Sequence, residues 1–336
     1  MILRRLGKTN LMVSAVGFGG IPIQKISKEE AIKVINFAEE MGINFIDTAR
    51  GYTVSEEYIG EALKGKRDKW IIATKSMARS KEAMEKDIEI SLNNLQTDYI
   101  DLYQIHNVKE METYKQVIAE DGALEALLKA KKEGKIGHIG ITAHSLDTLK
   151  VAIESEFFET IMYPYNIIEN QAEELFQLAA SKDIGVIAMK PMAGGALTDG
   201  SLAMRYILQN KNVSVIIPGM ANFDEVKENA EAVMGEESLT EEEKQLCRKI
   251  AEEMGQTFCR RCGYCAPCPQ GLDIGFNFLL KAYYDNYDLK EWAIERYNGM
   301  KAFAGDCREC GICEKRCPYN LPIRKMLKEV KKTFGK

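Results

Sequence analysis

The sequence predicts an α/β protein, a (β/α)8 TIM barrel followed by a small, mainly helical, cysteine-rich domain. From Val13 to about Gly235, short apolar runs rich in β-forming residues alternate with longer segments of helical period. This alternation favours a parallel sheet with crossover helices, and it repeats about eight times, the number of units in a closed barrel. Eight of the nine cysteines lie in two short runs beyond that region, so a second, smaller unit is expected after the barrel.

The expected strands begin near residues 13, 43, 69, 99, 136, 160, 184 and 213, with the sequences VSAVGF, INFID, KWIIATK, YIDLYQIH, IGHIGI, TIMY, IGVIAM and VSVIIP. A candidate helix follows each strand. In the first helix, residues 28–41, the side chains of Ala31, Ile32, Ile35 and Ala38 share one apolar stripe that would pack on the barrel wall. Catalytic side chains are expected at the C-terminal ends of the strands, where barrels of this kind build their active sites.

The barrel is expected to span residues 1–240, and residues 241–336 to form a connecting helix and the cysteine-rich domain. The stretch EEEKQLCRKIAEEMG, within residues 240–258, has the pattern of that helix. An aromatic segment of helical character, from Phe276 to Phe303, separates the two cysteine runs. Its aromatic side chains are interpreted as packing residues, because a stacking surface for bases would carry more interleaved Arg and Lys.

Composition is that of an ordinary soluble protein: 336 residues, 46% hydrophobic, with a net charge of −5. No stretch approaches the length of a membrane span, so no membrane partner is expected. The mild acidity argues against nucleic acid as a partner, and the basic tail from Arg324 to Lys336 is interpreted as a solvated helix face. The opening MILRRLGKTN lacks the apolar stretch of a secretory signal, so a cytoplasmic protein that acts on small molecules is expected.

The two cysteine runs have the spacing of iron–sulfur ligands. The first run contains Cys259, Cys262, Cys265 and Cys268, and the second contains Cys307, Cys310, Cys313 and Cys317. The second run has the bacterial ferredoxin pattern, in which three closely spaced thiolates hold one [4Fe–4S] cube and the fourth reaches a sister cluster. The region therefore resembles the dicluster ferredoxins, and the resemblance implies a ferredoxin-like domain that handles electrons.

On the ferredoxin pattern, Cys317 completes the cluster of the first run and Cys268 completes the cluster of the second. In the first run only two residues separate Cys265 from Cys268, where the pattern has three. The chain would therefore bind either two [4Fe–4S] clusters or one. Zinc is a weaker alternative, because it needs only four ligands, and a disulfide framework would require an oxidising compartment. Cys247 lies alone in a helical pattern and is assigned no ligand role.

Four polar residues lie where the second, third and fourth strands end. Asp47, Lys75 and His106 are at these C-terminal ends, and Tyr52 follows the second strand after a short loop. The stretches GINFIDTARGYTVSEEYIGEAL, IIATK and DLYQIH, with the opening RRLGKTNLMVSAVGFGG and the closing IIPGMANFDEVKENAEA, resemble the aldo-keto reductase family over roughly the first 235 residues. The resemblance implies that these four residues are the catalytic tetrad of a nicotinamide-dependent oxidoreductase.

The expected chemistry explains the residue types in the tetrad. Reduction of a carbonyl requires a hydride at carbon and a proton at the oxygen that becomes negative, and Tyr52 would donate that proton. A free phenol has a pKa of about 10, which a nearby cation lowers. Lys75 is the candidate cation, Asp47 would fix its ammonium group, and His106 would hold the carbonyl oxygen. Taken singly, each of these residues also has a structural explanation.

Two further histidines belong to the region of the fifth strand. His138 lies inside the strand and is interpreted as a core residue or a residue of the bottom face of the barrel. His144 lies just past the strand, on the face where the active site is expected. A contact of His144 with substrate or cofactor and a purely structural role are both open.

The resemblance implies that a nicotinamide dinucleotide lies extended across the barrel mouth, in keeping with the absence of a GxGxxG sequence. Glu228 and Asn229 match the pair that meets the adenine, and residues 219–222 match the loop around the adenosine phosphate. The expected cofactor contacts are Gly19, Thr142, Lys190, Pro191, Gly194, Gly219, Met220, Asn222, Glu225, Glu228 and Asn229. Lys190 could meet the pyrophosphate or extend outward, and Gly194 would let its loop approach the cofactor.

The chain departs from the family pattern at several of these positions. Members specific for NADPH carry a Lys and an Arg where this chain has Gly219 and Glu225, so a 2′-phosphate would lack its cations. Glu225 would instead accept a hydrogen bond from a ribose hydroxyl, which favours NAD(H) over NADP(H). Near the nicotinamide, Thr142, Met162 and Met189 replace the Ser, Gln and Tyr of the family, and Thr142 would still hydrogen-bond the carboxamide.

Two functions are therefore expected from the sequence. The first is a cytoplasmic oxidoreductase that interconverts a carbonyl and an alcohol and also carries [4Fe–4S] clusters. The alternative is an electron-transfer protein, in which the clusters serve a redox protein partner and the barrel is a scaffold or cofactor-binding module. A nicotinamide gives two electrons as a hydride while a [4Fe–4S] cluster normally accepts one, so an internal relay would require a converter such as a flavin. The substrate cannot be read from the sequence.

Overall fold

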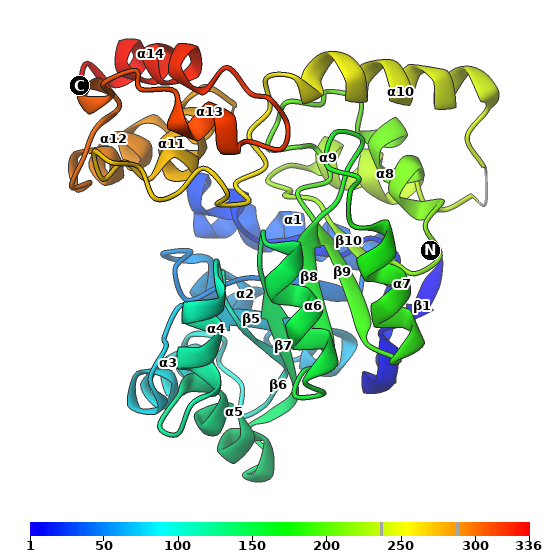
Figure 1. Cartoon of the computed structure of the whole chain (residues 1–336). Helices are drawn as coiled ribbons and strands as arrows, with labels where there is room; N and C mark the ends of the chain where they lie inside the picture. The colour runs from blue at the N-terminus through cyan, green and yellow to red at the C-terminus, as the bar shows by residue number, and fades with distance from the viewer. Residues whose placement is uncertain (236–237, 287–288) are drawn as a thin grey trace.

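A ring of parallel strands forms the centre of the molecule in the computed structural model, which describes residues 1–235, 238–286 and 289–336 (Figure 1). Its strands pair in the order β10-β9-β8-β7-β6-β5-β4-β3. Isolated parallel bridges between Val16 and Ile216 and between Gly19 and Gly219 join the two edges of the sheet. The strands are β3 (Phe18–Gly19), β4 (Phe45–Asp47), β5 (Ile71–Ser76), β6 (Ile100–Ile105), β7 (Ile136–Thr142), β8 (Thr160–Pro164), β9 (Gly185–Met189) and β10 (Val215–Ile217). The expected (β/α)8 barrel is confirmed.

The first expected strand is divided between two elements. β1 (Leu3–Arg5) and β2 (Met12–Ser14) form an antiparallel hairpin, so Val13 belongs to the hairpin and only residues 18–19 enter the barrel. The side chains of Leu6 and Val13 are fully buried in one cluster with the barrel-lining Phe45 and Leu102. The hairpin therefore supplies apolar side chains to the barrel interior, which one continuous strand from residue 13 would not have done.

Helices follow the strands and bury one apolar face each against the sheet. α1 (Lys28–Glu40) begins with a capping box between Ser27 and Glu30, and it buries Ala31, Ile35 and Ala38. The expected stripe is therefore present, with Ile32 at its half-buried margin. The other barrel helices are α2 (Ser55–Ala62), α3 (Lys81–Asn94), α4 (Met111–Ile118), α5 (Ala123–Lys132), α6 (Leu146–Glu154), α7 (Glu173–Ser181), α8 (Gly200–Leu208) and α9 (Phe223–Glu231).

The C-terminal region is helical. α10 (Glu241–Gly255) packs against the barrel core through Cys247 and Ile250, and the helices α11 (Ile274–Asn286), α12 (Lys290–Asn298), α13 (Ile312–Arg316) and α14 (Ile323–Phe334) share a hydrophobic core of their own. Leu280, Tyr297, Leu327 and Val330 are buried in this core, apart from the barrel. Figure 1 shows α10 leading across to α11–α14, which gather over one end of the barrel. Within the described residues, the search for a helix both long and apolar enough to cross a membrane found none.

Candidate active site and cluster-binding domain

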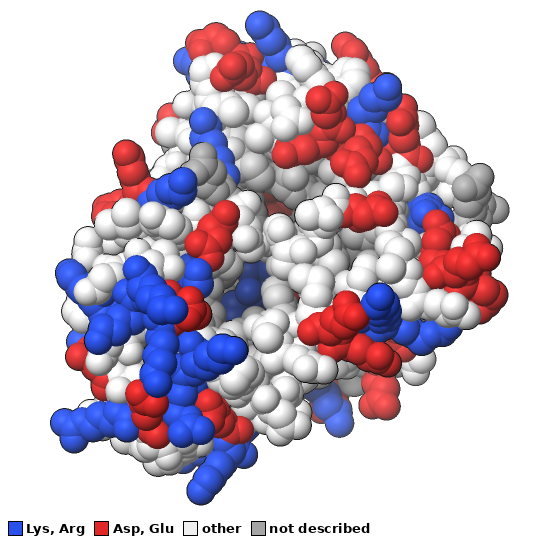
Figure 2. Space-filling view, turned by 90° about the horizontal axis from the view of Figure 1, so that it is seen from above, with Lys and Arg blue, Asp and Glu red and all other residues white. Residues whose placement is uncertain are grey.

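A large cavity lies between the barrel mouth and the C-terminal helices. Its volume is about 1790 Å³, and Asp47, Tyr52, Lys75 and His106 are among its lining residues. Pockets for single small molecules usually measure about 300–1,000 Å³, so this space is larger than one small molecule requires. The surface is visibly hollowed on the face seen from above, and Lys or Arg atoms lie inside the hollow (Figure 2).

The floor of the cavity contains a buried ion pair. The Lys75 ammonium contacts the Asp47 carboxylate and also donates a hydrogen bond to the Thr48 carbonyl at 2.8 Å. Gln104 Nε2 donates to the other Asp47 oxygen at 3.2 Å. Burial raises the pKa of Asp47, and its contacts with Lys75 and Gln104 oppose that rise. These contacts fix the ammonium at the C-terminal end of β5, as expected for the cation of the tetrad.

Tyr52 and His106 lie next to this pair. The Lys75 Nζ is 5.1 Å from the centroid of the Tyr52 ring, and the Tyr52 and His106 rings meet edge to face with centroids 6.2 Å apart. Burial, with the nearby cations Lys75, Arg79 and Lys190, holds the pKa of His106 well below its usual value. The imidazole is therefore neutral, and among the described residues no hydrogen-bond partner meets its buried Nδ1. The structure thus brings all four expected residues together.

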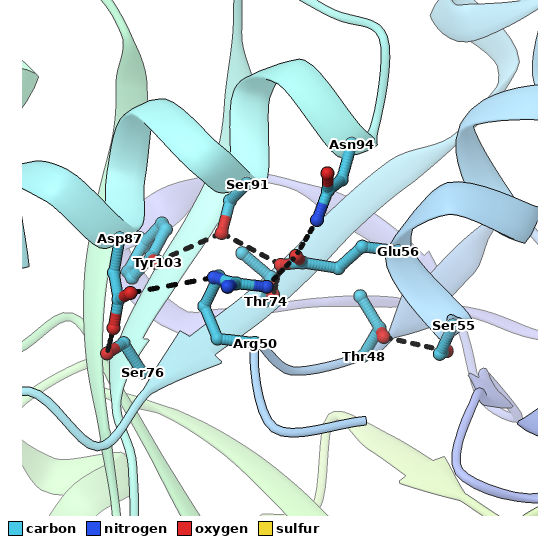
Figure 3. Close-up of polar contacts among 10 residues, drawn as sticks. All are labelled: Thr48, Arg50, Ser55, Glu56, Thr74, Ser76, Asp87, Ser91, Asn94 and Tyr103. Atoms are coloured by element: carbon cyan, nitrogen blue, oxygen red, sulfur yellow. Dashed lines mark hydrogen bonds and ion pairs between the residues drawn. The ribbon is translucent and has the colours of Figure 1, made fainter. Parts of the chain in front are cut away.

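A second polar network lies on the other side of β5 (Figure 3). The Glu56 side chain is 1% exposed, and its carboxylate accepts from Thr74 Oγ1 at 2.8 Å, Ser91 Oγ at 2.8 Å, Arg50 Nη1 at 3.0 Å and Asn94 Nδ2 at 3.2 Å. Thr74 immediately precedes Lys75, and successive side chains of a strand point to opposite faces. The network therefore joins β5 to α2 and α3, and it was not anticipated from the sequence.

Most of the expected cofactor contacts line the cavity. Thr142 is buried at the end of β7, where its Oγ1 accepts from the Asn107 amide at 2.8 Å, and its own proton remains available to a carboxamide oxygen. Gly19, at the end of β3, pairs with Gly219 just after β10. A side chain would not fit there, because a Cβ at this position would lie 2.5 Å from the Pro218 carbonyl oxygen. The expected contacts on the cavity wall are Gly19, Thr142, Lys190, Pro191, Gly194, Gly219, Glu225, Glu228 and Asn229.

Two of the expected cofactor contacts are not on the cavity wall. Met220 is fully buried in the barrel's hydrophobic core, and Asn222 caps α9 by accepting from the Glu225 amide at 2.9 Å. The Glu225 carboxylate accepts from the Ala221 amide at 2.6 Å. Asn222 and Glu225 thus hold the loop before α9, and a ribose hydroxyl would share the Glu225 carboxylate with that amide. The sequence matches alone do not distinguish such loop-holding groups from cofactor contacts.

The glycine loop after β9 contacts the C-terminal domain. Gly195 has a φ of +79°, and a Cβ there would lie 2.9 Å from the Asn286 side chain. Asn286 Nδ2 donates to the Gly194 carbonyl at 3.2 Å. Tyr283 and Trp292, whose ring centroids are 5.0 Å apart, also line the cavity. The aromatic segment therefore packs as expected and in addition forms part of the roof above the tetrad.

The cysteines of the two runs form two groups, one around each of two cavities, and the two groups share two members. Those on the large cavity are Cys259, Cys262, Cys265, Cys268 and Cys317, and those around a second cavity of about 20 Å³ are Cys265, Cys268, Cys307, Cys310 and Cys313. Each crossed set expected from the ferredoxin pattern is contained in one group. In the described residues, no three His, Cys, Asp or Glu side chains are placed to hold a single metal ion.

Burial governs the chemistry of these thiols. It raises the pKa of Cys259 to about 11 and is also the main cause that raises the pKa of Cys265 to about 12. Such thiols stay protonated at neutral pH unless a metal displaces the proton. The grouping of free thiols around two cavities agrees with the two ligand sets of the ferredoxin pattern.

Two arginines between the first two cysteines join the domains. Arg260 is buried, with its Nη2 donating to the Ile168 carbonyl at 3.1 Å, and its guanidinium lies 4.0 Å from the centroid of the Tyr319 ring. Arg261 Nη2 lies 3.5 Å from Glu169 Oε1, and Arg261 lines the large cavity. No role was predicted for either arginine from the sequence, although two consecutive cations between cysteines of one run are a signal that could have indicated one.

Comparisons with known proteins agree with this geometry. The profile of the 4Fe-4S dicluster domain matches residues 258–322, and that of the aldo/keto reductase family matches residues 15–201. L-galactose dehydrogenase of Arabidopsis thaliana is 32% identical over 70% of this chain and 89% of its own length. The NADH-specific methylglyoxal reductase of Escherichia coli is 28% identical over 73% of this chain and 80% of its own.

Solved structures show the same relationship. The holo form of an aldo-keto reductase from Bacillus halodurans matches with a TM-score of 0.67 and 30% identity, over 75% of this chain and 96% of that one. A putative aldo-keto reductase from Pseudomonas matches with a TM-score of 0.62 and 27% identity, over 69% of this chain and 95% of that one. The chain belongs to the aldo/keto reductase family and carries a C-terminal 4Fe-4S dicluster domain.

Proposed function

We propose that this protein interconverts a carbonyl and an alcohol with a nicotinamide dinucleotide, with Tyr52 as the proton donor. The observation that carries the proposal is the grouping of Tyr52, Lys75 and His106 on one cavity wall, beside the buried Asp47. The named activities of the plant and bacterial relatives, a sugar dehydrogenase and a methylglyoxal reductase, are of the same reaction class.

Each residue has a distinct part in the proposed reaction. A reduced nicotinamide, when bound, supplies a hydride to the carbonyl carbon. Tyr52 gives its hydroxyl proton to the oxygen as negative charge develops there, and Lys75 stabilises the resulting phenolate. His106, neutral and with one ring nitrogen unpartnered among the described residues, positions the carbonyl oxygen. In the oxidative direction the phenolate of Tyr52 takes the proton back.

We also propose NAD(H) as the preferred dinucleotide. Glu225 lies on the cavity wall with its carboxylate held against the Ala221 amide, and that negative charge would repel a 2′-phosphate. Dissociation constants for NADH and NADPH, measured anaerobically by fluorescence, are expected to favour NADH. Glu225→Gln should narrow the difference, and tighter binding of NADPH by the unaltered protein would contradict the assignment.

A second candidate function is electron transfer through the clusters. It is favoured by one observation: thiols of the first group, including Cys259 and Cys262, line the same cavity as Tyr52. A cluster held there would lie beside the reacting substrate. Cys310, in the second group, is exposed, so the second cluster would lie near the surface, where a redox protein could reach it. The mismatch between a two-electron hydride and a one-electron cluster applies to any path that starts at the nicotinamide.

One experiment separates the two functions. NADH is added anaerobically to the purified protein while the nicotinamide and cluster absorbances are followed together, with and without a panel of aldehydes and ketones. Oxidation of NADH only in the presence of a carbonyl, with constant cluster absorbance, supports carbonyl reduction. Bleaching of the clusters by NADH alone would instead show one electron path and a converter that the structure does not reveal.

The cluster ligands are tested by iron content. Replacing Cys310 with Ala should remove the second cluster and lower the bound iron from about eight atoms toward about four. Cys247→Ala is the matched control, because Cys247 is a buried free thiol outside both groups. An unchanged iron count in the Cys310 variant would refute its assignment as a ligand.

A further inference from the structure

The reacting end of the cavity carries cations that the proposed reaction does not use. Lys190 lies directly after β9 with a φ of +57°, a backbone conformation that costs free energy for a residue with a side chain. Its carbonyl accepts from Asn166 Nδ2 at 3.0 Å, which holds it there. Lys190 lines the cavity, and in the described part of the chain no carboxylate lies within ion-pair distance of its ammonium. Burial and Arg261 lower the pKa of Lys190 to about 7, and only the more distant Glu169 carboxylate opposes them, so an anion bound here would favour the charged form of Lys190.

Arg261 brings a second cation to the same place from the other domain. Its side chain is 12% exposed, and its Nη2 is 3.5 Å from Glu169 Oε1. The Glu169 carboxylate also accepts from Asn166 Nδ2 at 3.1 Å, so one turn, residues 166–169, braces both Lys190 and Arg261. The Arg261 Nε is buried and has no hydrogen-bond partner among the described residues. The domain interface thus brings Arg261, with one donor still unused, to the turn that also holds the backbone of Lys190.

Two histidines, His106 and His144, line the same cavity as these two residues. The pKa of His144 is lowered by burial first and then by Lys190 and Arg261, and Lys190 also contributes to the lowered pKa of His106. His144 Nε2 is buried without a partner in the described structure, and the residue lines the cavity.

We propose that Lys190, Arg261 and His144 form an oxyanion-binding subsite for the substrate, so that the substrate is a carbonyl or hydroxy compound bearing a carboxylate or phosphate close to the reacting carbon. The proposal rests on the proposed carbonyl chemistry and specifies its substrate class. An oxyanion there would satisfy two cations and an imidazole N–H, and such charge-assisted hydrogen bonds are the strong ones. It would also place the reacting carbonyl between the subsite and Tyr52.

Two other anions could use the same cations. The pyrophosphate of the dinucleotide could reach Lys190, and the thiolates of the first cluster could be balanced by Arg261, which lies between Cys259 and Cys262. Each alternative has its own signature. A role toward the pyrophosphate would alter dinucleotide binding, and a role toward the cluster would alter iron content or the cluster spectrum. Only a substrate site distinguishes a charged substrate from its neutral counterpart.

The test compares benzoylformate with its methyl ester, two substrates that share one ketone and differ by one negative charge. For the unaltered protein, kcat/KM measured anaerobically with NADH should favour the acid. In Arg261→Gln the acid-to-ester ratio of kcat/KM should fall about tenfold or more, the effect of one lost hydrogen bond to a charged group. The dissociation constant for NADH and the iron content should stay unchanged.

Arg308→Gln is the control, because Arg308 is likewise an arginine between the first two cysteines of a run, yet it is exposed and absent from the wall of the large cavity. Its acid-to-ester ratio should equal that of the unaltered protein. An equal preference for acid and ester in the unaltered protein, or an equal fall for both in Arg261→Gln, would overturn the proposal. So would weaker NADH binding as the main effect of Arg261→Gln.

A binding measurement separates this inference from the proposed function. Equilibrium dialysis of radiolabelled benzoylformate against the NAD⁺-saturated protein reports the subsite without turnover. If neither ketone is reduced but benzoylformate binds and Arg261→Gln weakens that binding about tenfold, the carbonyl chemistry fails and the subsite stands. If the ester is reduced but benzoylformate binding does not depend on Arg261, the chemistry stands and the subsite fails.

Discussion

The two faces of β5 carry two buried charge networks of opposite design. On the inner face, Lys75 contacts Asp47 at the floor of the cavity, and the neighbouring His106 and Gln104 each keep a buried polar atom without a partner among the described residues. On the outer face, the Glu56 carboxylate accepts four hydrogen bonds from surrounding side chains (Figure 3). Both networks are buried, so burial does not separate them.

The difference between them is where the incomplete groups lie. A buried polar group without a partner costs about 1–3 kcal/mol; in the outer network Arg50 Nε has no hydrogen bond, but it lies 3.6 Å from the Asp87 carboxylate, as an ion pair. Glu56 is saturated by protein groups and therefore links β5 to α2 and α3. The inner network includes His106, whose unpartnered side chain lines the cavity, where a ligand would complete its hydrogen bonds. Unsatisfied groups on a cavity wall thus mark the functional face more clearly than the presence of charge does.

The largest expected effect is on catalysis at the inner face. Tyr52→Phe removes the proposed proton donor, and general acid catalysis contributes about 10²–10⁴-fold in rate, so kcat for carbonyl reduction should fall by at least about a hundredfold. The variant should keep its iron and its unfolding midpoint, because the ring and its contact with His106 remain. Turnover equal to that of the unaltered protein would remove Tyr52 from its role.

The outer network should show the opposite response. Glu56→Ala leaves Arg50 and several hydroxyl and amide donors without their acceptor, and loss of one partner of a buried ion pair costs about 3–5 kcal/mol. Chemical unfolding should therefore occur at a clearly lower denaturant concentration, while kcat per folded molecule stays nearly constant. Glu57→Ala is the control, since Glu57 is exposed and a surface substitution changes stability by about 0.5 kcal/mol or less. Equal stability of the two variants would show that the outer network is not structural.

A smaller effect concerns protonation near the inner face. The pKa values of His106 and His144 are both held well below their usual value, by burial first and then by nearby cations. At pH 5.5, about one unit below the ordinary value, both imidazoles should still be neutral in the folded protein. The unfolded chain then binds more protons than the folded one. The free energy of unfolding should therefore decrease as the pH falls below about 6.5.

Nuclear magnetic resonance of the histidine ring protons measures this directly, with His106→Asn and His144→Asn to assign the signals. Constant chemical shifts between pH 7.5 and 5.5 are expected for both rings. A titration midpoint near 6.5 for His106 would mean that the ring is solvated, and it would remove the contrast between the two faces of β5.

The sequence was informative wherever function depends on local spacing. The alternation of strands and helices, the four tetrad positions and the two cysteine runs all depend on short-range patterns, and the fold follows those patterns. The positions of Met220 and Arg261 depend on which distant segments meet, whereas Asn222 caps α9 through the Glu225 amide, a local contact. Met220 is buried because a loop turns inward, and Arg261 reaches the barrel only because its domain packs over the mouth. Periodicity and motif matching contain no information about such packing.

Arg260 has a consequence for how the enzyme would be assembled in the cell. Its side chain joins the barrel, through the Ile168 carbonyl, to Tyr319 beside the last cysteine of the second run. Cluster binding, which orders the cysteine loops, and closure of the barrel roof would therefore be linked equilibria. Under iron limitation, a chain with an intact barrel would lack its roof. The supply of iron would then set the fraction of chains able to enclose a substrate.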